Sequence, residues 1–202
     1  MTGSVCACVP GLLVAGRDDR GIAKAFLSVG SVEVALRDGR RVLIRSVTRS
    51  DACLIQQGFD RLSPESRRNR FLMPVTRLTD QAVASLVTLD RESSDAVGAL
   101  SLDEPGHPGV GIARYARVPG SPDVAEAAVT VLDDYQSVRL GTALGVVLAS
   151  LAGRRGISRL RAHVLADNRR VLALLDRWGA SLHVDSPGVA VAEIDIDTFA
   201  AI

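Results

Sequence analysis

The chain has 202 residues and a formal net charge of +1, so neither nucleic acid nor an anionic membrane is an expected partner. Hydrophobic residues make up 47% of the chain and aromatic residues only 3%, which predicts a sizeable core of mainly aliphatic side chains. This length favours a single domain with an extension.

The first part of the chain, residues 1–36, has only weak patterning. Cys6, Cys8 and the later Cys53 are too few for a disulfide framework, which fits a reducing compartment, and no histidine lies close to them in sequence, so we expect no metal site. The apolar run from Val9 to Ala15 is too short to span a membrane and follows no basic segment. We therefore expect a cytoplasmic protein without a membrane anchor or signal peptide.

The role of this N-terminal extension stays open. Ile22 to Val29 and Ser31 to Leu36 fit short strands or a helix equally well. The extension is either disordered, or caps the edge of a sheet, or forms an interface. We separate it from a domain over residues 37–202.

The next elements are predicted to be one strand and three helices. Arg41 to Val47 has the apolar, β-branched composition of a strand. Helix-capping residues then recur along the chain. They are Thr48 to Asp51 before a helix to about Phe59, Ser63 followed by Pro64, and Thr79 followed by Asp80.

The rest of the chain alternates strands and helices. Proline- and glycine-rich turns separate three strands, and a helix, a strand and a second helix then precede two final strands. This order predicts an α/β fold in which a mixed central sheet is flanked by helices in a single domain. The expected ranges are strands at 95–102, 110–117, 124–132, 159–165, 180–184 and 189–196, and helices from 139 and over 168–178.

The stretch from Val124 to Leu148 gives the clearest indication of function. Val129, Thr130 and Val131 are β-branched, as in a buried strand, whereas Leu140 and the apolar residues after it recur on one face of a helix. A polar turn joins the two elements. A strand, a glycine-containing turn and a helix start direct backbone N–H groups to one point, which is a common way to bind phosphate.

These residues also resemble a known family. Gln136 to Thr142, reading QSVRLGT, resembles the Q/R-x-x-G-x-G/A pyrophosphate loop of the GNAT superfamily of acyl-CoA-dependent N-acetyltransferases. The resemblance extends over roughly residues 40–196 and implies a GNAT-like fold. Arg61 to Phe71, reading RLSPESRRNRF, resembles more narrowly the branch that contains bacterial protein-lysine acetyltransferases.

The resemblance implies acetyl-CoA as co-substrate and assigns residues to it. The backbone at Val129, Thr130 and Val131 would bind the pantetheine arm, and Asn168 would contact the cofactor further along. The residues around the pyrophosphate would be Gln136, Ser137, Val138, Arg139, Leu140, Gly141 and Thr142.

Arg139 departs from the family pattern, because it stands where the loop has its first glycine. A helical backbone at this position would be open to any residue. The guanidinium group either pairs with a phosphate or obstructs the approach of the phosphate to the backbone. If it obstructs, the chain is a GNAT-fold binding or regulatory protein with impaired catalysis.

Glu126 is the candidate general base. It is a lone carboxylate inside an apolar strand, where burial should raise its pKa and prepare it to accept a proton near neutral pH. The resemblance places the base of the lysine-modifying branch at the same position. The alternative is an ion pair with Arg114 or Arg117, and His163 on a later strand is expected to be a structural, hydrogen-bonded histidine.

We therefore expect direct acetyl transfer from acetyl-CoA to a primary amine. The favoured acceptor is protein lysine, with a small amine left open. A covalent acyl-enzyme is not expected, because no cysteine lies near the motif. The sequence also leaves a homodimer open.

Overall fold

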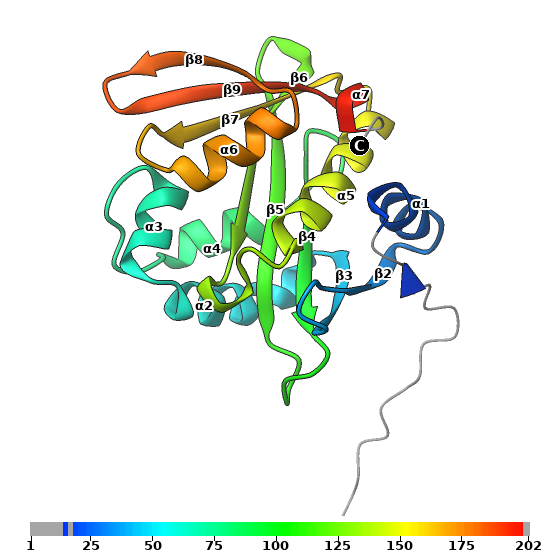
Figure 1. Cartoon of the computed structure of the whole chain (residues 1–202). Helices are drawn as coiled ribbons and strands as arrows, with labels where there is room; N and C mark the ends of the chain where they lie inside the picture. Colours follow the sequence, from blue (N-terminus) through cyan, green and yellow to red (C-terminus); the bar gives the residue numbers. More distant parts are fainter. Residues whose placement is uncertain (1–13, 16–17, 200–202) are drawn as a thin grey trace, which may run out of the picture.

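In the computed structural model, residues 14–15 and 18–199 are described, and they form one mixed nine-stranded sheet in the order β1-β2-β3-β4-β5-β6-β7-β9-β8 (Figure 1). Neighbouring strands are antiparallel except at β1–β2 and β6–β7, which are parallel. The predicted fold class is confirmed. The strands are β1 (Val14–Ala15), β2 (Ser31–Ala35), β3 (Arg41–Ser46), β4 (Ser94–Ser101), β5 (Gly109–Val118), β6 (Ser121–Val131), β7 (Arg159–Leu165), β8 (Ser181–Ser186) and β9 (Val189–Asp195).

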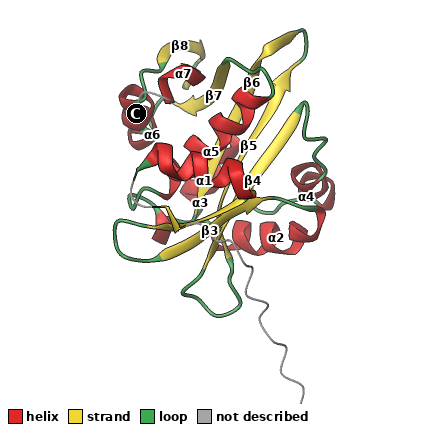
Figure 2. Ribbon diagram, turned by 90° about the vertical axis from the view of Figure 1, so that its right-hand side faces the viewer, coloured by secondary structure: helices red, strands yellow, loops and turns green. Residues whose placement is uncertain are grey.

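Helices cover both faces of the sheet (Figure 2). Helices α1 and α5 lie on one face, and α2 and α4 lie on the other, with α3 close to β6. The helices are α1 (Asp19–Val29), α2 (Ala52–Arg61), α3 (Pro64–Phe71), α4 (Asp80–Val87), α5 (Leu140–Arg154), α6 (Arg169–Arg177) and α7 (Ile196–Phe199), with 3-10 turns η1 (Arg49–Asp51) and η2 (Asp133–Tyr135).

The predicted helix starts are confirmed by their caps. The side chain of Ser63 accepts a hydrogen bond from the N–H of Ser66 at 3.1 Å, and that of Thr79 accepts one from Ala82 at 3.2 Å. Each bond satisfies one of the backbone N–H groups that a helix leaves without an internal partner. Local sequence therefore determines where these two helices begin.

Residues 18–36 form a helix followed by a strand. Asp18 caps α1, Gly30 ends it in the left-handed region at φ 82°, and β2 then pairs with β3 along its length. Ile22 and Phe26 are buried in the same core as α5 and the sheet. Of the three alternatives, the structure corresponds to capping of the sheet edge, whereas Cys6 and Cys8 lie outside the described residues.

In the part of the chain that the structure describes, no helix is long and apolar enough to cross a membrane.

Candidate active site at the split between β6 and β7

The central sheet opens between its two parallel strands, β6 and β7. They pair only over residues 124–126 and 159–161. Beyond this point β6 continues to pair with β5, and β7 pairs with β9, so residues 127–131 have no strand on their other edge. Val129, in this stretch, is 38% exposed. An unpaired strand edge of this kind can bind an extended ligand through its main chain.

The N-terminus of α5 lies just after this edge. The first backbone bond within the helix runs from the N–H of Ala143 to the carbonyl of Arg139, at 3.0 Å. The N–H groups of Leu140, Gly141 and Thr142 precede it and have no acceptor among the described residues. Together with the positive end of the helix dipole, they form a site suited to an anion.

Arg139 differs from the sequence expectation in two ways. Its backbone is left-handed, at φ 75° and ψ 3°, and not helical. This region favours glycine, which is the residue that the family pattern has here. Its guanidinium group faces α1, with Nη2 2.6 Å from Oδ2 of Asp19, whose side chain is only 5% exposed.

In this structure the side chain of Arg139 pairs with Asp19, an arrangement that the sequence did not predict, and the two alternatives for its effect on a bound phosphate stay predictions. The charge of Arg139 is neutralised by the helix that precedes the domain proposed from sequence. The pairing could not be found from the sequence, because the two residues are 120 positions apart and Asp19 lies in a segment without a clear pattern.

Asp133 attaches α3 to the loop before α5, a role that sequence reasoning missed. Its carboxylate accepts hydrogen bonds from the N–H of Ser63 at 3.0 Å and from the hydroxyls of Ser63 and Ser66, both at 2.7 Å. Burial alone would raise the pKa of Asp133, but these hydrogen bonds outweigh it and the pKa is lowered. The serines of the SPES segment thus position α3 beside β6 and the loop.

Gln136 and Asn168 also form protein contacts. The Gln136 amide donates to the carbonyl of Val131 and to Ser66 Oγ, each at 3.2 Å, and its oxygen accepts a hydrogen bond from Arg170. Asn168 caps α6 by accepting from the N–H of Val171 at 3.2 Å. Gln136 therefore ties the loop to β6, α3 and α6.

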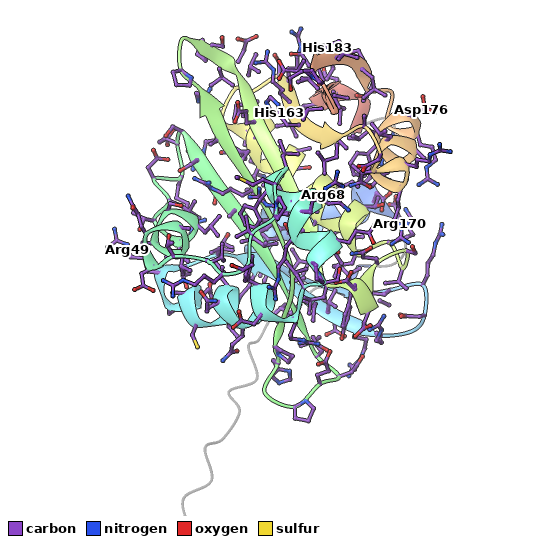
Figure 3. The ribbon with its side chains drawn as sticks, turned by 90° about the vertical axis from the view of Figure 1, so that its left-hand side faces the viewer. Arg49, Arg68, His163, Arg170, Asp176 and His183 are labelled. Atoms are coloured by element: carbon purple, nitrogen blue, oxygen red, sulfur yellow. The ribbon has the colours of Figure 1, made fainter. Side chains whose placement is uncertain are left out.

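Two arginines from different helices lie close to this loop. Figure 3 labels Arg68 on α3 and Arg170 on α6. Arg68 forms an ion pair with Asp167 at 3.0 Å, and Arg170 binds Gln136. Arg170 thus brings a positive charge to the loop, whereas the charge of Arg68 is balanced by Asp167.

The expected burial of Glu126 is wrong, because its side chain is 58% exposed. The cause is the split itself, since Glu126 is the last residue of β6 that pairs with β7, and solvent reaches it where the strands separate. It has no ion pair with Arg114 or Arg117. Its neighbour is His163 on β7, with Nε2 of His163 3.8 Å from Oε1 of Glu126. The sequence interpretation of His163 as a structural, hydrogen-bonded residue did not predict this pairing.

No family model matches the chain. An acetyltransferase of Pseudomonas aeruginosa is 35% identical over 135 residues, which are 67% of this chain and 72% of the relative. Acetyltransferase Pat of Mycolicibacterium smegmatis is 36% identical over 89 residues, 44% of this chain but only 27% of its own length. The crystal structure of the GNAT domain of S. lividans PAT superposes with a TM-score of 0.75 at 29% identity, covering 82% of this chain and 96% of that domain.

Proposed function

Since the chain belongs to the GNAT family of acetyltransferases and is an acyltransferase enzyme, we propose that it transfers the acetyl group of acetyl-CoA to a primary amine at the split between β6 and β7. One observation carries the proposal. The unpaired edge of β6 is followed, after the loop of residues 132–139, by N–H groups at the start of α5 that have no acceptor among the described residues. The relatives favour this enzyme over the alternative of a catalytically impaired binding protein.

The two features match the two ends of the co-substrate. The pantetheine arm contains amides and would pair with the backbone of residues 127–131 as an added strand. The pyrophosphate would bind the N–H groups of Leu140, Gly141 and Thr142. Gln136 supports the loop through its protein contacts, and Asn168 holds the start of α6.

Glu126 is the proposed general base. The amine loses a proton to its carboxylate, directly or through a water molecule, and the nitrogen attacks the thioester carbonyl. A C–N bond forms, the C–S bond breaks, and the electron pair leaves with the thiolate of coenzyme A. His163, 3.8 Å from the carboxylate, helps to position it. The exposure of Glu126 gives an incoming amine direct access.

The acceptor class is a separate part of the proposal. The likeness of residues 61–71 to the lysine-modifying branch favours a protein lysine. A small amine is the alternative, since the same chemistry applies to any uncharged primary amine beside Glu126.

Glu126→Gln tests the mechanism. The variant should bind acetyl-CoA with wild-type affinity in isothermal titration, because the substituted side chain lies outside the residues proposed to hold the cofactor. Turnover should fall about a hundredfold or more, the usual contribution of a general base. Asp185→Asn, on the exposed strand β8, removes a carboxylate elsewhere and should leave both values unchanged. Unchanged turnover in the Glu126 variant would remove this residue from the mechanism.

A further inference from the structure

A cavity lies on the face of the sheet that carries Glu126. Its volume is about 100 Å³, and it extends between β4, β5, β6 and the helices α2 and α4. Ala128 and Thr130 of β6 line it, and residues two apart on a strand face the same side, so Glu126 shares this face. The cavity lining therefore begins at Ala128, two residues along β6 from the proposed base and on the same face.

Most of the cavity wall is apolar. An engineered cavity of about 150 Å³ with such a lining is large enough for benzene, so this volume suits one small apolar group. It does not suit a folded segment of another protein. The apolar lining includes Leu54, Ile55, Phe59, Leu62, Phe71, Leu78 and Leu86.

Two arginines in the wall lack a counter-ion. Arg70 of α3 and Arg114 of β5 both line the cavity, and the guanidinium group of neither has a hydrogen bond or an ion pair with any described residue. Nε of Arg114 is buried without a partner, and the guanidinium carbon of Arg70 lies 5.1 Å from the ring centroid of Phe71. A third arginine in the same wall, Arg45, is paired with Asp51 at 2.6 Å.

The two unpaired charges are close enough to affect each other. Burial lowers the pKa of Arg70 and the adjacent charge of Arg114 lowers it further, while burial lowers the pKa of Arg114. Two like charges in an apolar wall cost free energy unless an anion neutralises them. Arg114 on β5 is opposite Ala128 on β6, so Glu126 is its diagonal neighbour on the same face of the sheet. The carboxylate of Glu126, however, contacts His163 and not Arg114.

We propose that Arg70 and Arg114 bind the carboxylate of the acceptor, and that the acceptor is a free apolar α-amino acid. Its amine would face Glu126, its carboxylate the two arginines, and its side chain the cavity. A lysine within a protein has no carboxylate of its own near its amine, whereas a free amino acid always has one. The assignment rests on the proposed acetyl transfer and selects the small-amine alternative over protein lysine.

The test compares acceptors with and without the carboxylate. Valine, leucine, isoleucine, methionine and phenylalanine are supplied with acetyl-CoA, and N-acetylated products are quantified by mass spectrometry. L-leucinol, which has an alcohol in place of the carboxylate of leucine, is the matched control. At least one amino acid should be acetylated, and leucine should exceed leucinol at least about tenfold in kcat/KM, the worth of a charge-assisted contact.

Variants of the arginines separate recognition from folding. Arg70→Met and Arg114→Met should each lower kcat/KM for the preferred amino acid about tenfold to hundredfold, mainly by raising KM. The kcat/KM for leucinol should stay unchanged in both variants. Acetyl-CoA affinity should be unchanged, and the melting temperature should be kept or raised because an unpaired charge is removed. Arg114→Lys should restore part of the loss. Arg49→Met, at an exposed arginine on η1 (Figure 3), should behave as wild type.

The outcomes distinguish this assignment from the proposed function. Acetyl-CoA binding with acetylation of a lysine peptide but of none of the five amino acids would overturn the assignment and leave the proposed function standing. Equal losses for leucine and leucinol in the arginine variants would also overturn it. Failure of the wild-type protein to bind acetyl-CoA would overturn the proposed function and the acceptor assignment with it.

Discussion

At the scale of single residues, Arg139 is the main departure from the family pattern. A side chain in the left-handed region costs about 1–2 kcal/mol, which a glycine would avoid. Removing one partner of a buried ion pair costs about 3–5 kcal/mol, and Asp19 is the buried partner here. Because Arg139 itself is one-third exposed, the lower end applies, yet the pair still outweighs the backbone strain.

Arg139→Gly should therefore destabilise the protein without weakening the cofactor site. We expect unfolding free energy to fall by about 1–2 kcal/mol, the difference between the lost pair and the relieved strain. Acetyl-CoA affinity should not fall, and its dependence on ionic strength should match wild type, since the guanidinium is bound to Asp19.

Two further measurements complete this comparison. Adding Asp19→Asn to Arg139→Gly should recover part of the stability, because no buried charge is then left unpaired. If the glycine variant binds acetyl-CoA more weakly than wild type, and more so at low salt, then Arg139 pairs with a phosphate of the cofactor.

Glu126 and Arg139 show what the sequence could give at this scale. The sequence placed Glu126 on the strand before the loop and Arg139 at the end of the loop before the helix, and the structure has both residues there. The sequence could not give the exposure of Glu126, because it depends on where β6 and β7 stop pairing. The last pair is Glu126 with Arg161, two residues that are 35 positions apart in the chain. The sequence also could not give the αL backbone of Arg139, which its contact with α1 stabilises.

At the scale of elements, the turn between β3 and α2 carries a pH-dependent contact. Asp51 binds Arg45 at 2.6 Å and accepts from the N–H of Thr48 at 2.7 Å. The hydrogen bond from Arg45, with that of Thr48, lowers the pKa of Asp51 to about 2 despite partial burial. This pair also forms one end of the cavity wall.

Asp51→Asn should lower the free energy of unfolding by about 2 kcal/mol at neutral pH. This is the free energy that corresponds to lowering the pKa of Asp51 from its ordinary value of 3.8 to about 2. The lowered pKa means that the contribution is present above the unfolded value near 4 and is lost as pH falls through about 2. Urea unfolding of both proteins from pH 7 to pH 2.5 measures this. A difference that stays constant across that range would contradict the role of the charge.

The elements were predicted best where local sequence decides them. Ser63 and Thr79 cap helices where the sequence placed them. Ile22 to Val29 stayed ambiguous because a short apolar run fits a helix or a strand, and its packing on α5 is a long-range contact. The serine bonds to Asp133 are likewise long-range, spanning about 70 positions in the sequence.

At the scale of the molecule, α1 is part of the core that supports α5 and its N-terminus. Phe26 is 2% exposed within that core, whereas Val29 on the same helix is 47% exposed. Phe26→Ala should lower stability by about 3–5 kcal/mol. Val29→Ala, the matched control, should stay within about 0.5 kcal/mol of wild type. Equal stability of the two variants in thermal or urea unfolding would show that α1 does not pack as described.

The central claim is that acetyl-CoA binds along the open edge of β6 and at the start of α5, and amide chemical shifts test it most directly. Isotope-labelled protein is titrated with acetyl-CoA, and shifts are followed residue by residue. We predict saturable shifts concentrated at residues 127–131 and 137–142, including the N–H groups of Leu140, Gly141 and Thr142, with β8 unaffected. Absence of binding, or shifts confined to other parts of the sheet, would contradict the account.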